Sequence, residues 1–261
     1  MKMLNILEKT KILRCLVEGN SLRSTERITG HARWTINKLL ISAGIACEKY
    51  QEKYLKNISS NFIEVDEIWS FVGCKERGLS RGKIGHGDIW TFVAIDCESK
   101  LVIHWETGDR GIKEATNMMD QLAFKINKRF QLTTDGYGKY GEAVEKIFRG
   151  EIDFAMAVKS YQGKKYETTK KVVMSGKPIK RKVSTTYIER QNLTMRMGMR
   201  RFTRKTNAFS KKLENHKHAI DLHFFYYNFV RIHKTLKITP AMAAGISHVP
   251  MKLEWLAEMT C

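Results

Sequence analysis

At residue 61 the spacing of apolar residues changes from that of a helix to the alternation of a strand. This change constrains the fold of the chain more than any other feature of its sequence. In the stretch NFIEVDEIWSFVG, apolar Ile63 and Val65 alternate with acidic residues, which predicts a strand with one buried face. Two nearly continuous apolar runs follow, DIWTFVAID and KLVIHWE, separated by CES. They predict a hairpin that contains an inner strand of a sheet.

Helical spacing returns over residues 112–127, where apolar residues recur every three or four positions. A short strand, FQLTT, then ends at Asp135, and a helix over 139–148 precedes a fifth strand, IDFAMAV. Three antiparallel strands, a helix, a strand, a helix and a strand form the order of the ribonuclease-H-like fold. We therefore predict an α/β chain with a ribonuclease-H-like mixed five-stranded sheet and flanking helices.

The first sixty residues predict short helices. One helix stops at Gly19, and Ser21 caps the next, which Gly30 ends. A third helix covers 32–43, with Gly44 closing it. Two helices joined by a glycine-containing turn are typical of a helix-turn-helix, which inserts its second helix into the major groove of DNA. A three-helix bundle with a solvated charged face is the alternative. In the first interpretation, the DNA-binding residues are Arg33, Trp34, Asn37 and Lys38.

These patterns predict an N-terminal all-α helix-turn-helix DNA-binding domain over 1–58, a catalytic domain over 59–240 and a C-terminal tail over 241–261. Residues 159–185 are polar, basic and poor in large apolar side chains. We interpret them as a basic insertion or extended loop within the catalytic domain. A long helix is expected around 207–229, and its three histidines lack cysteine partners, which favours packing or surface positions for them.

The charge is unevenly distributed along the chain. The formal net charge is +19, and residues 159–212 hold 17 Lys and Arg against 2 Asp and Glu, whereas residues 61–158 hold 13 against 16. This distribution predicts a polyanionic partner such as nucleic acid. The five cysteines form no C-x-x-C pair, which argues against a zinc ribbon or a disulfide framework and favours a reducing, intracellular setting. No apolar run approaches the length of a membrane span, so we expect a soluble protein and no membrane partner.

Three carboxylates are the candidate catalytic residues. Asp66 lies in the first predicted strand, Asp135 at the end of the fourth, and Glu189 near the start of a helix. Because the first and fourth strands are neighbours in a ribonuclease-H-like sheet, the two Asp side chains can converge, and a helix packed on that sheet can add the third acid. Carboxylate oxygens suit Mg²⁺. Two such ions can activate a water or 3′-hydroxyl and stabilise the leaving oxygen of a phosphoryl displacement.

Each acid also has an ordinary structural interpretation. Asp66 fits an exposed strand position, Asp135 a turn, and Glu189 a capping box that begins at Thr186. Taken together, the element order and the adjacent basic segment favour the catalytic interpretation. Asn192, one turn from Glu189, is expected to position substrate. The phosphate-binding side chains expected around Glu189 are Arg190, Arg196, Arg200, Arg201, Arg204, Lys205, Lys211 and Lys212.

The stretches VDEIWSFV, DIWTFVAID, TTDGYGKY, YIERQNLTMRMGMRRFTRKTNAFSKK and YNFVRIHKTL resemble the catalytic region of insertion-sequence-one family transposases, a bacterial branch of the DDE enzymes. The resemblance spans most of residues 61–240. It implies that Asp66, Asp135 and Glu189 are the acidic triad. This triad would bind two Mg²⁺ ions, for which Mn²⁺ substitutes. Some family members carry a cysteine-rich zinc ribbon before their helix-turn-helix, and this sequence has none.

The resemblance also implies an activity and partners. The enzyme would cleave transposon ends and join their 3′-hydroxyls to target DNA. Its partners would be the terminal inverted repeats and target DNA as duplexes, bound by a homodimer or higher oligomer in the bacterial cytoplasm, on the nucleoid. A non-catalytic repressor of its own element is the alternative, against which the three acids argue. A nuclease acting on hybrids is a third possibility, against which the helix-turn-helix argues.

Overall fold

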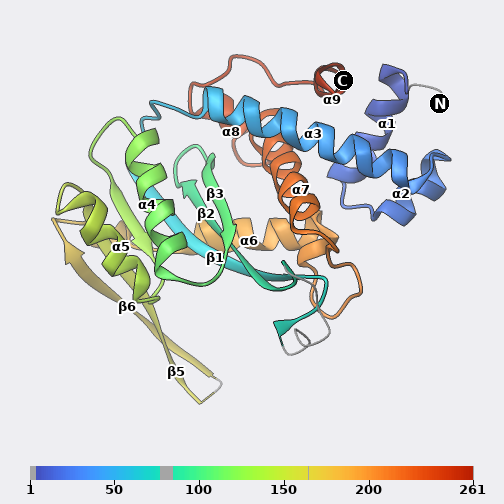
Figure 1. Cartoon of the computed structure of the whole chain (residues 1–261). Helices are drawn as coiled ribbons and strands as arrows, with labels where there is room; N and C mark the ends of the chain where they lie inside the picture. The colour runs from blue at the N-terminus through green and yellow to red at the C-terminus, as the bar shows by residue number, and fades with distance from the viewer. Residues whose placement is uncertain (1–3, 77–84, 164, 261) are drawn as a thin grey trace. The chain divides into compact units, whose positions relative to one another are not determined.

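The computed structural model describes residues 4–76, 85–163 and 165–260. Its elements divide between two compact units (Figure 1). The sheet unit consists of residues 55–69 and 89–192, and the helical unit of residues 1–54, 70–88 and 193–261. Within the described ranges, no helix has both the length and the apolar character that a membrane crossing requires.

The sheet has six strands in the order β3-β2-β1-β4-β5-β6. Strand β1 pairs with β4 in parallel, and β4 with β5 in parallel, whereas β2–β3 and β5–β6 are antiparallel pairs. The predicted hairpin and the predicted neighbourhood of the first and fourth strands are therefore confirmed. The strands are β1 Phe62–Val72, β2 Gly87–Asp96, β3 Val102–Gly108, β4 Gln131–Thr134, β5 Asp153–Gln162 and β6 Lys165–Ser175.

Helices α4 (Ile112–Lys125) and α5 (Lys139–Phe148) pack against each other beside the sheet (Figure 1). The first was expected from apolar residues at helical spacing, which are buried, and the second was expected over 139–148. Helix α6 (Thr186–Gly198) carries Glu189 in its first turn, as predicted. Short 3₁₀ turns at Lys180–Lys182 and Arg200–Phe202 flank α6 in the sequence.

The prediction of five strands and of an extended loop over 159–185 is wrong. Strand β5 continues to Gln162, and Lys165–Ser175 forms a sixth strand, so the two make a hairpin that projects from the sheet (Figure 1). Nearly all of β6 is exposed. A strand without a buried face shows no alternation of apolar and polar residues, and for this reason its sequence resembled a loop.

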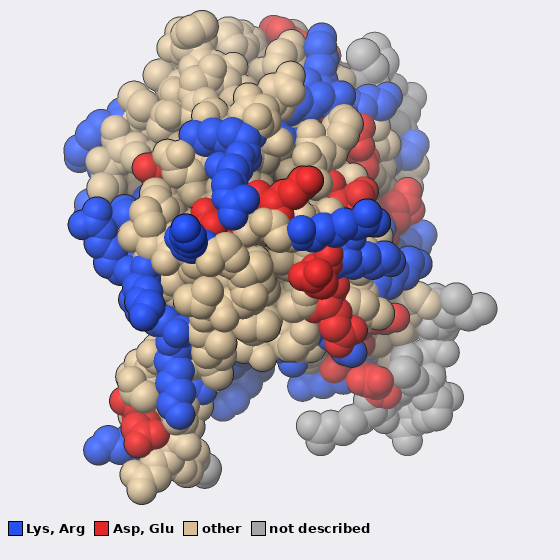
Figure 2. Space-filling model, turned by 90° about the vertical axis from the view of Figure 1, so that its left-hand side faces the viewer, with Lys and Arg blue, Asp and Glu red and all other residues tan. Residues whose placement is uncertain are grey.

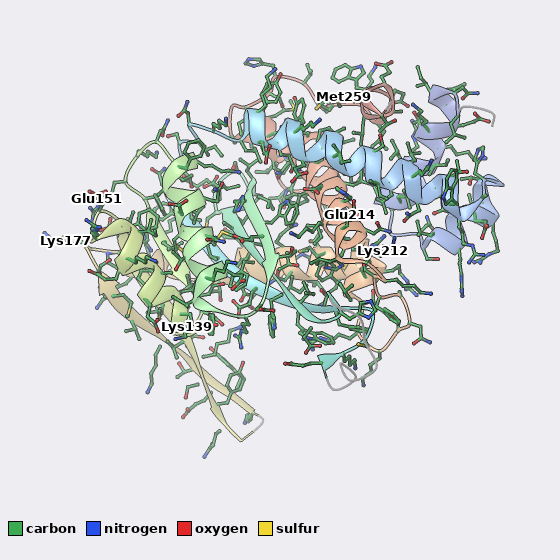
Figure 3. All side chains as sticks on the ribbon, viewed as in Figure 1. Lys139, Glu151, Lys177, Lys212, Glu214 and Met259 are labelled. Carbon is green, nitrogen blue, oxygen red and sulfur yellow. The ribbon has the colours of Figure 1, made fainter. Side chains whose placement is uncertain are left out.

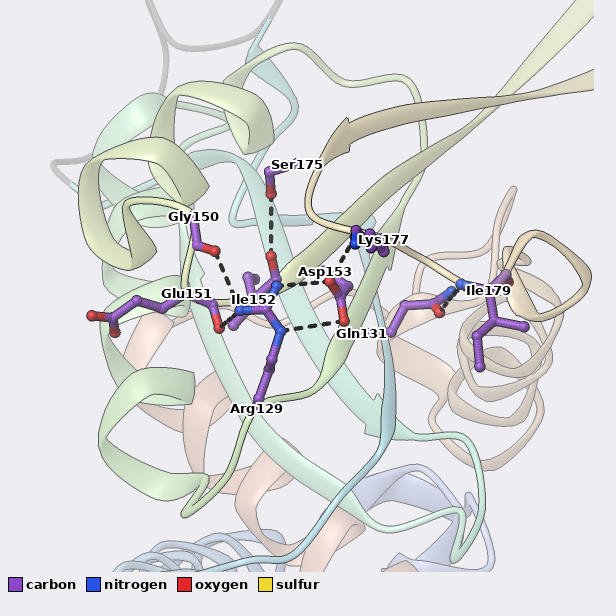
Figure 4. Close-up of polar contacts among 9 residues, drawn as sticks. All are labelled: Arg129, Gln131, Gly150, Glu151, Ile152, Asp153, Ser175, Lys177 and Ile179. Atoms are coloured by element: carbon purple, nitrogen blue, oxygen red, sulfur yellow. Dashed lines mark hydrogen bonds and ion pairs between the residues drawn. The ribbon is translucent and has the colours of Figure 1, made fainter.

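The base of this hairpin is fixed by a polar network (Figure 4). The Arg129 guanidinium donates to both carboxylate oxygens of Asp153, and the Lys177 main-chain N–H donates to the same carboxylate at 2.8 Å. The Ile179 N–H donates to Gln131 Oε1 at 2.7 Å. These bonds attach the segment after β6 to β4 and β5, so the projecting strands start from a rigid base.

The helical unit contains α1 to α3, α7 and two short C-terminal helices. Ser21 accepts a hydrogen bond from Ser24 N–H at the start of α2, and Gly30 ends that helix with φ 75°, as predicted. Helix α9 packs against α1 and α3. The bounds are α1 Ile6–Val17, α2 Leu22–Thr29, α3 Arg33–Tyr54, α7 Leu213–Phe225, a π-turn over Tyr226–Val230, α8 Pro240–Ala243 and α9 Leu253–Met259.

Helix α3 does not end at Gly44 but continues to Tyr54. A Cβ on Gly44 would lie 2.3 Å from Cβ of His218, so this glycine lets α3 and α7 approach closely. Glycine has two structural uses, at helix ends and at close contacts, and the sequence does not distinguish them.

Candidate active site

Asp66, within β1, and Asp135, directly after the end of β4, meet where the two parallel strands stop pairing. The last registered pair of β1 and β4 is Val65 with Thr134, and the two Asp residues follow directly. Carboxylate oxygens of Asp66, Asp135 and Glu67 all lie within 4.8 Å of one another. The expected convergence of the two Asp side chains is therefore present, and Glu67 joins them.

This concentration of negative charge changes the protonation of Asp66. Burial and the charges of Glu67 and Asp135 raise the pKa of Asp66 to about 7, and Glu189 adds to the effect. Asn192 Nδ2 donates a hydrogen bond to Asp66 Oδ2 at 2.8 Å. The amide thus fixes one oxygen of an acid that is protonated in part of the molecules at neutral pH.

Glu67 is held by two side chains from outside its strand. Its Oε1 accepts from the Arg110 guanidinium at 2.5 Å, and its Oε2 accepts from the Tyr140 hydroxyl at 2.7 Å. Although Arg110 and Tyr140 favour its charged form, burial and the charge of Asp135 leave the pKa of Glu67 above its ordinary value. Both oxygens are therefore already engaged, and the side chain is rigid.

Asp135 closes a turn and is surrounded by the same network. Its Oδ1 accepts from the Tyr137 N–H at 2.9 Å, and the Tyr137 hydroxyl donates to the Arg110 carbonyl at 2.8 Å. The Arg110 guanidinium lies 4.4 Å from the centroid of the Tyr137 ring and 4.7 Å from that of Trp90. Arg110 thereby connects the turn of Asp135 to the carboxylate of Glu67.

Helix α6 is attached to the sheet through Glu64, which is 1% exposed. Glu64 Oε2 accepts from the Ile188 N–H at 2.9 Å, in the first turn of α6, where the helix dipole favours an anion. Burial nevertheless raises the pKa of Glu64 to about 7. Because Ile188 precedes Glu189, this bond positions the third acid.

Glu189 itself interacts with a lysine. Its Oε1 accepts from Lys159 Nζ at 2.5 Å and from the Thr185 hydroxyl at 2.7 Å. Burial raises the pKa of Glu189, but these bonds and the lysine charge outweigh it, so the pKa lies below its ordinary value. Helix α6 begins at Thr186, one residue earlier than a capping box with Thr186 as its N-cap requires, and the Glu189 carboxylate bonds to side chains.

The chemistry of this site fits a divalent cation. Carboxylate oxygens are hard ligands, and three of them from two strands converge here. Asn192 is 5% exposed, and its Oδ1 has no hydrogen-bond partner among the described residues. A bound cation would offset the repulsion that raises the pKa of Asp66 and Glu67. A water on that cation could donate to Asn192 Oδ1.

The predicted DNA-binding residues have different environments. Trp34 is exposed, and Lys38 Nζ lies 3.9 Å from the centroid of its ring. Arg33 forms an ion pair with Glu26. Asn37 accepts a hydrogen bond from Asn215. Asn192 is buried against Asp66 instead of facing solvent. Arg201 donates to Ser210 at 2.7 Å, and burial lowers its pKa to about 10. Arg196 is partly buried, and the exposed members are Arg190, Arg200, Arg204, Lys205, Lys211 and Lys212.

Sequence reasoning missed Glu67, Arg110, Tyr140 and Lys159. Alternation along a strand directs Glu67 and Asp66 to opposite faces of β1, yet both carboxylates reach Asp135, which follows the end of β4. An acid at an expected buried position of an inner strand was the available signal for Glu67. The sequence held no such signal for Arg110 and Lys159, because they lie outside the elements that carry the three candidate acids.

The sequence comparisons agree with the motif resemblance. A family model described as IS1 transposase matches residues 152–230. The insertion element iso-IS1n protein InsB of Shigella dysenteriae is 29% identical over 168 residues, which cover 62% of this chain and 96% of that protein.

Two solved structures of Mos1 transposase also match, with low scores. The paired-end complex with the left transposon end has 12% identity and a TM-score of 0.23, over 57% of this chain and 58% of that one. The strand transfer complex has 12% identity and a TM-score of 0.25, over 85% and 78%.

Proposed function

Both sequence matches support an IS1-family DDE transposase, and from this premise we propose that the chain cleaves transposon ends and joins their 3′-hydroxyls to target DNA. The observation that carries the proposal is the convergence of Asp66, Glu67 and Asp135 at the end of β4. Glu189 lies near enough to raise the pKa of Asp66. The strand order through β5 and the parallel β1–β4 pair support a ribonuclease-H-like fold for the sheet.

Asp66, Asp135 and Glu189 are the residues that would hold the cation. A family of this type implies a divalent cation, for which we propose two Mg²⁺ ions, with Mn²⁺ as a substitute. When bound, such ions supply charge stabilisation for the attacking and leaving oxygens of phosphoryl transfer. Asn192 orients Asp66, and the bond from Ile188 to Glu64 keeps the helix of Glu189 on the sheet.

Lys159 has a separate role in this proposal. Its ammonium neutralises Glu189 while the site is without cation, at an N–O distance of 2.5 Å. If Glu189 held a cation, this ammonium would lose its partner. The lysine is then available to a phosphate oxygen at the same face of β5.

The DNA itself would extend onto the hairpin β5–β6. Lys159 pairs with Thr169, and the hydroxyls of Thr169 and Tyr166 lie 2.9 Å apart, so these side chains share the face that contacts Glu189. Tyr161 and Tyr166 are 57% and 52% exposed there. Figure 2 shows Lys and Arg along this projection, at the lower left. Exposed aromatic rings beside cations are typical of surfaces that bind DNA.

The remaining assignments complete the proposal. Residues 1–58 would act as a helix-turn-helix that reads the terminal repeats, with Arg33, Trp34 and Lys38 exposed for this purpose. Residues 59–240 would form the catalytic domain. We propose a homodimer or higher oligomer on duplex DNA, because two transposon ends are processed together, acting on the bacterial nucleoid in the cytoplasm.

Strand transfer by purified protein on labelled transposon-end DNA tests this function. With Mg²⁺ or Mn²⁺, the wild type should join ends to target, and Asp135→Asn and Glu189→Gln should each lose joining by at least about a hundredfold while DNA binding persists. Glu142→Gln, which changes an exposed acid paired with Lys139, is the matched control and should retain activity. Binding without joining by the wild type would instead favour the repressor.

A further inference from the structure

A second group of metal-ligating side chains lies within the helical unit. Glu48 of α3 and His218 and Asp221 of α7 each present one ligand atom, and these atoms all lie within 4.8 Å of one another. The i, i+3 spacing puts His218 and Asp221 on one face of α7. In the sequence, Glu48 and His218 are too far apart to be associated.

The close approach of the two helices brings the group together. His218 packs against Gly44, where any Cβ would overlap it at 2.3 Å. Glu48 follows Gly44 by one helical turn on α3 and therefore faces the same neighbour. Gln51, in the next turn, donates to the main-chain carbonyl of Asp221 at 3.3 Å, which fixes this part of α7 against α3.

A ring nitrogen at the centre of the group lacks a hydrogen-bond partner among the described residues. Asp221 has a side chain that is 4% exposed, and its polar neighbour among the described residues is His218 Nδ1 at 3.7 Å, longer than a hydrogen bond. His218 Nδ1 is buried and has no hydrogen-bond partner in the described part of the chain. By contrast, the buried His216 in the same helix contacts Ser70 and Ser210 through both ring nitrogens, at 3.2 and 3.0 Å.

The distance of 3.7 Å between His218 Nδ1 and Asp221 Oδ2 fits two ligands of one cation better than two atoms that share a proton. Two ligands of one tetrahedral ion with bonds of about 2.0–2.2 Å lie roughly 3.3–3.6 Å apart. The charged groups that face Asp221 are mostly acidic: burial and the charges of Glu48 and Glu52 raise its pKa to about 8, and Lys217 opposes them. Negative charge therefore outweighs positive charge around Asp221.

We propose that Glu48, His218 and Asp221 bind a divalent cation of the zinc class and so link α3 to α7. An imidazole nitrogen among carboxylates favours Zn²⁺ or Co²⁺ over Mg²⁺, whereas the acids of the sheet unit offer oxygen alone. Glu48 is exposed, which leaves access for a water as the remaining ligand. Glu214, near the start of α7 (Figure 3), lies 4.0 Å from His218 Nε2, longer than a hydrogen bond.

Co²⁺ titration of the full chain tests the site. The background is the double variant Asp66→Asn, Asp135→Asn, which removes two of the three clustered carboxylates of the sheet unit. We expect one equivalent of Co²⁺ with the strong visible absorption of a tetrahedral nitrogen–oxygen site, displaced by Zn²⁺. In that background, His218→Gln and Asp221→Asn should each weaken binding by at least about tenfold.

Glu52→Gln provides the matched control. It removes the same charge from the same helix near Asp221 but changes no proposed ligand, so Co²⁺ affinity should change less than about threefold. Glu48→Gln, at an exposed position that tolerates substitution, repeats the test if either buried variant fails to fold. Absence of Co²⁺ binding, or binding that Glu48→Gln and His218→Gln leave unchanged, would overturn the proposal. Neither result depends on strand transfer, so the proposed transposase activity is tested separately.

Discussion

Asp66→Asn should stabilise the metal-free protein, and more so at high pH. The pKa of Asp66 is raised from 3.8 to about 7 in the folded chain. A raised folded-state pKa means that the contribution of this group to stability is fully present below pH ~4 and is lost as pH rises through ~7. At pH 8 the charged Asp66 therefore costs free energy that a neutral amide does not.

The magnitude follows from the shift. About three pKa units at ~1.4 kcal/mol each give an upper value of roughly 4 kcal/mol. Solvent screening at this partly exposed position reduces it, so we expect Asp66→Asn to raise the free energy of unfolding by about 2–3 kcal/mol at pH 8. At pH 5 most of the wild-type Asp66 is protonated, and the gain should fall to about 1 kcal/mol.

Urea unfolding in a chelator at pH 5 and pH 8 measures this difference. Comparing the two proteins cancels other groups of raised pKa, such as Glu64 and Asp221. Adding Mn²⁺ at pH 8 should stabilise the wild type and have little effect on Asp66→Asn. A variant that is less stable than the wild type at pH 8, or a difference that does not change with pH, would refute the electrostatic reasoning.

Three further predictions concern packing and charge. Tyr140→Phe leaves one oxygen of Glu67 without its buried donor, so the free energy of unfolding should fall by about 1–3 kcal/mol in chemical denaturation. An unchanged value would mean that water replaces the hydroxyl. Gly44→Ala should lower the free energy of unfolding by roughly 1–3 kcal/mol, because the added methyl group clashes with α7. Gly138→Ala, at a position with open space around it, should leave thermal melts unchanged. Arg200→Gln should weaken binding to all DNA sequences alike and reduce the slope of log K against log salt by about 1 in fluorescence anisotropy, and loss at one sequence alone would contradict a phosphate contact.

The sequence predicted the centre of the candidate site because that centre depends on strand order. Once the first and fourth strands are neighbours, Asp66 and Asp135 must lie side by side, and the register from Phe62–Gln131 to Val65–Thr134 produces this juxtaposition. Local signals were also sufficient for the start and end of α2, where a capping hydroxyl and a left-handed glycine act within a few residues.

Features that depend on long-range packing were not predictable in this way. The exposed strand β6 has no buried face to impose a pattern, and Gly44 has the same local signature whether it ends a helix or admits a neighbour. Likewise, the partners of His218 and Glu189 come from α3 and β5, far away in the chain. Periodicity identifies which face of an element is buried, but not which side chain of another element it meets.

Two of the three proposed metal ligands, Asp66 and Glu189, have opposite pKa shifts, and this contrast has a chemical consequence. Asp66 is surrounded by acids and holds a proton in part of the molecules at pH 7, whereas Glu189 is kept ionised by Lys159. In the metal-free protein, therefore, a proton neutralises one of these two proposed ligands and an ammonium neutralises the other. A divalent cation has to displace both, so its affinity should rise with pH through ~7 and stop rising once Asp66 is fully ionised. Ionisation of Asp66 therefore destabilises the metal-free protein and at the same time raises its affinity for metal.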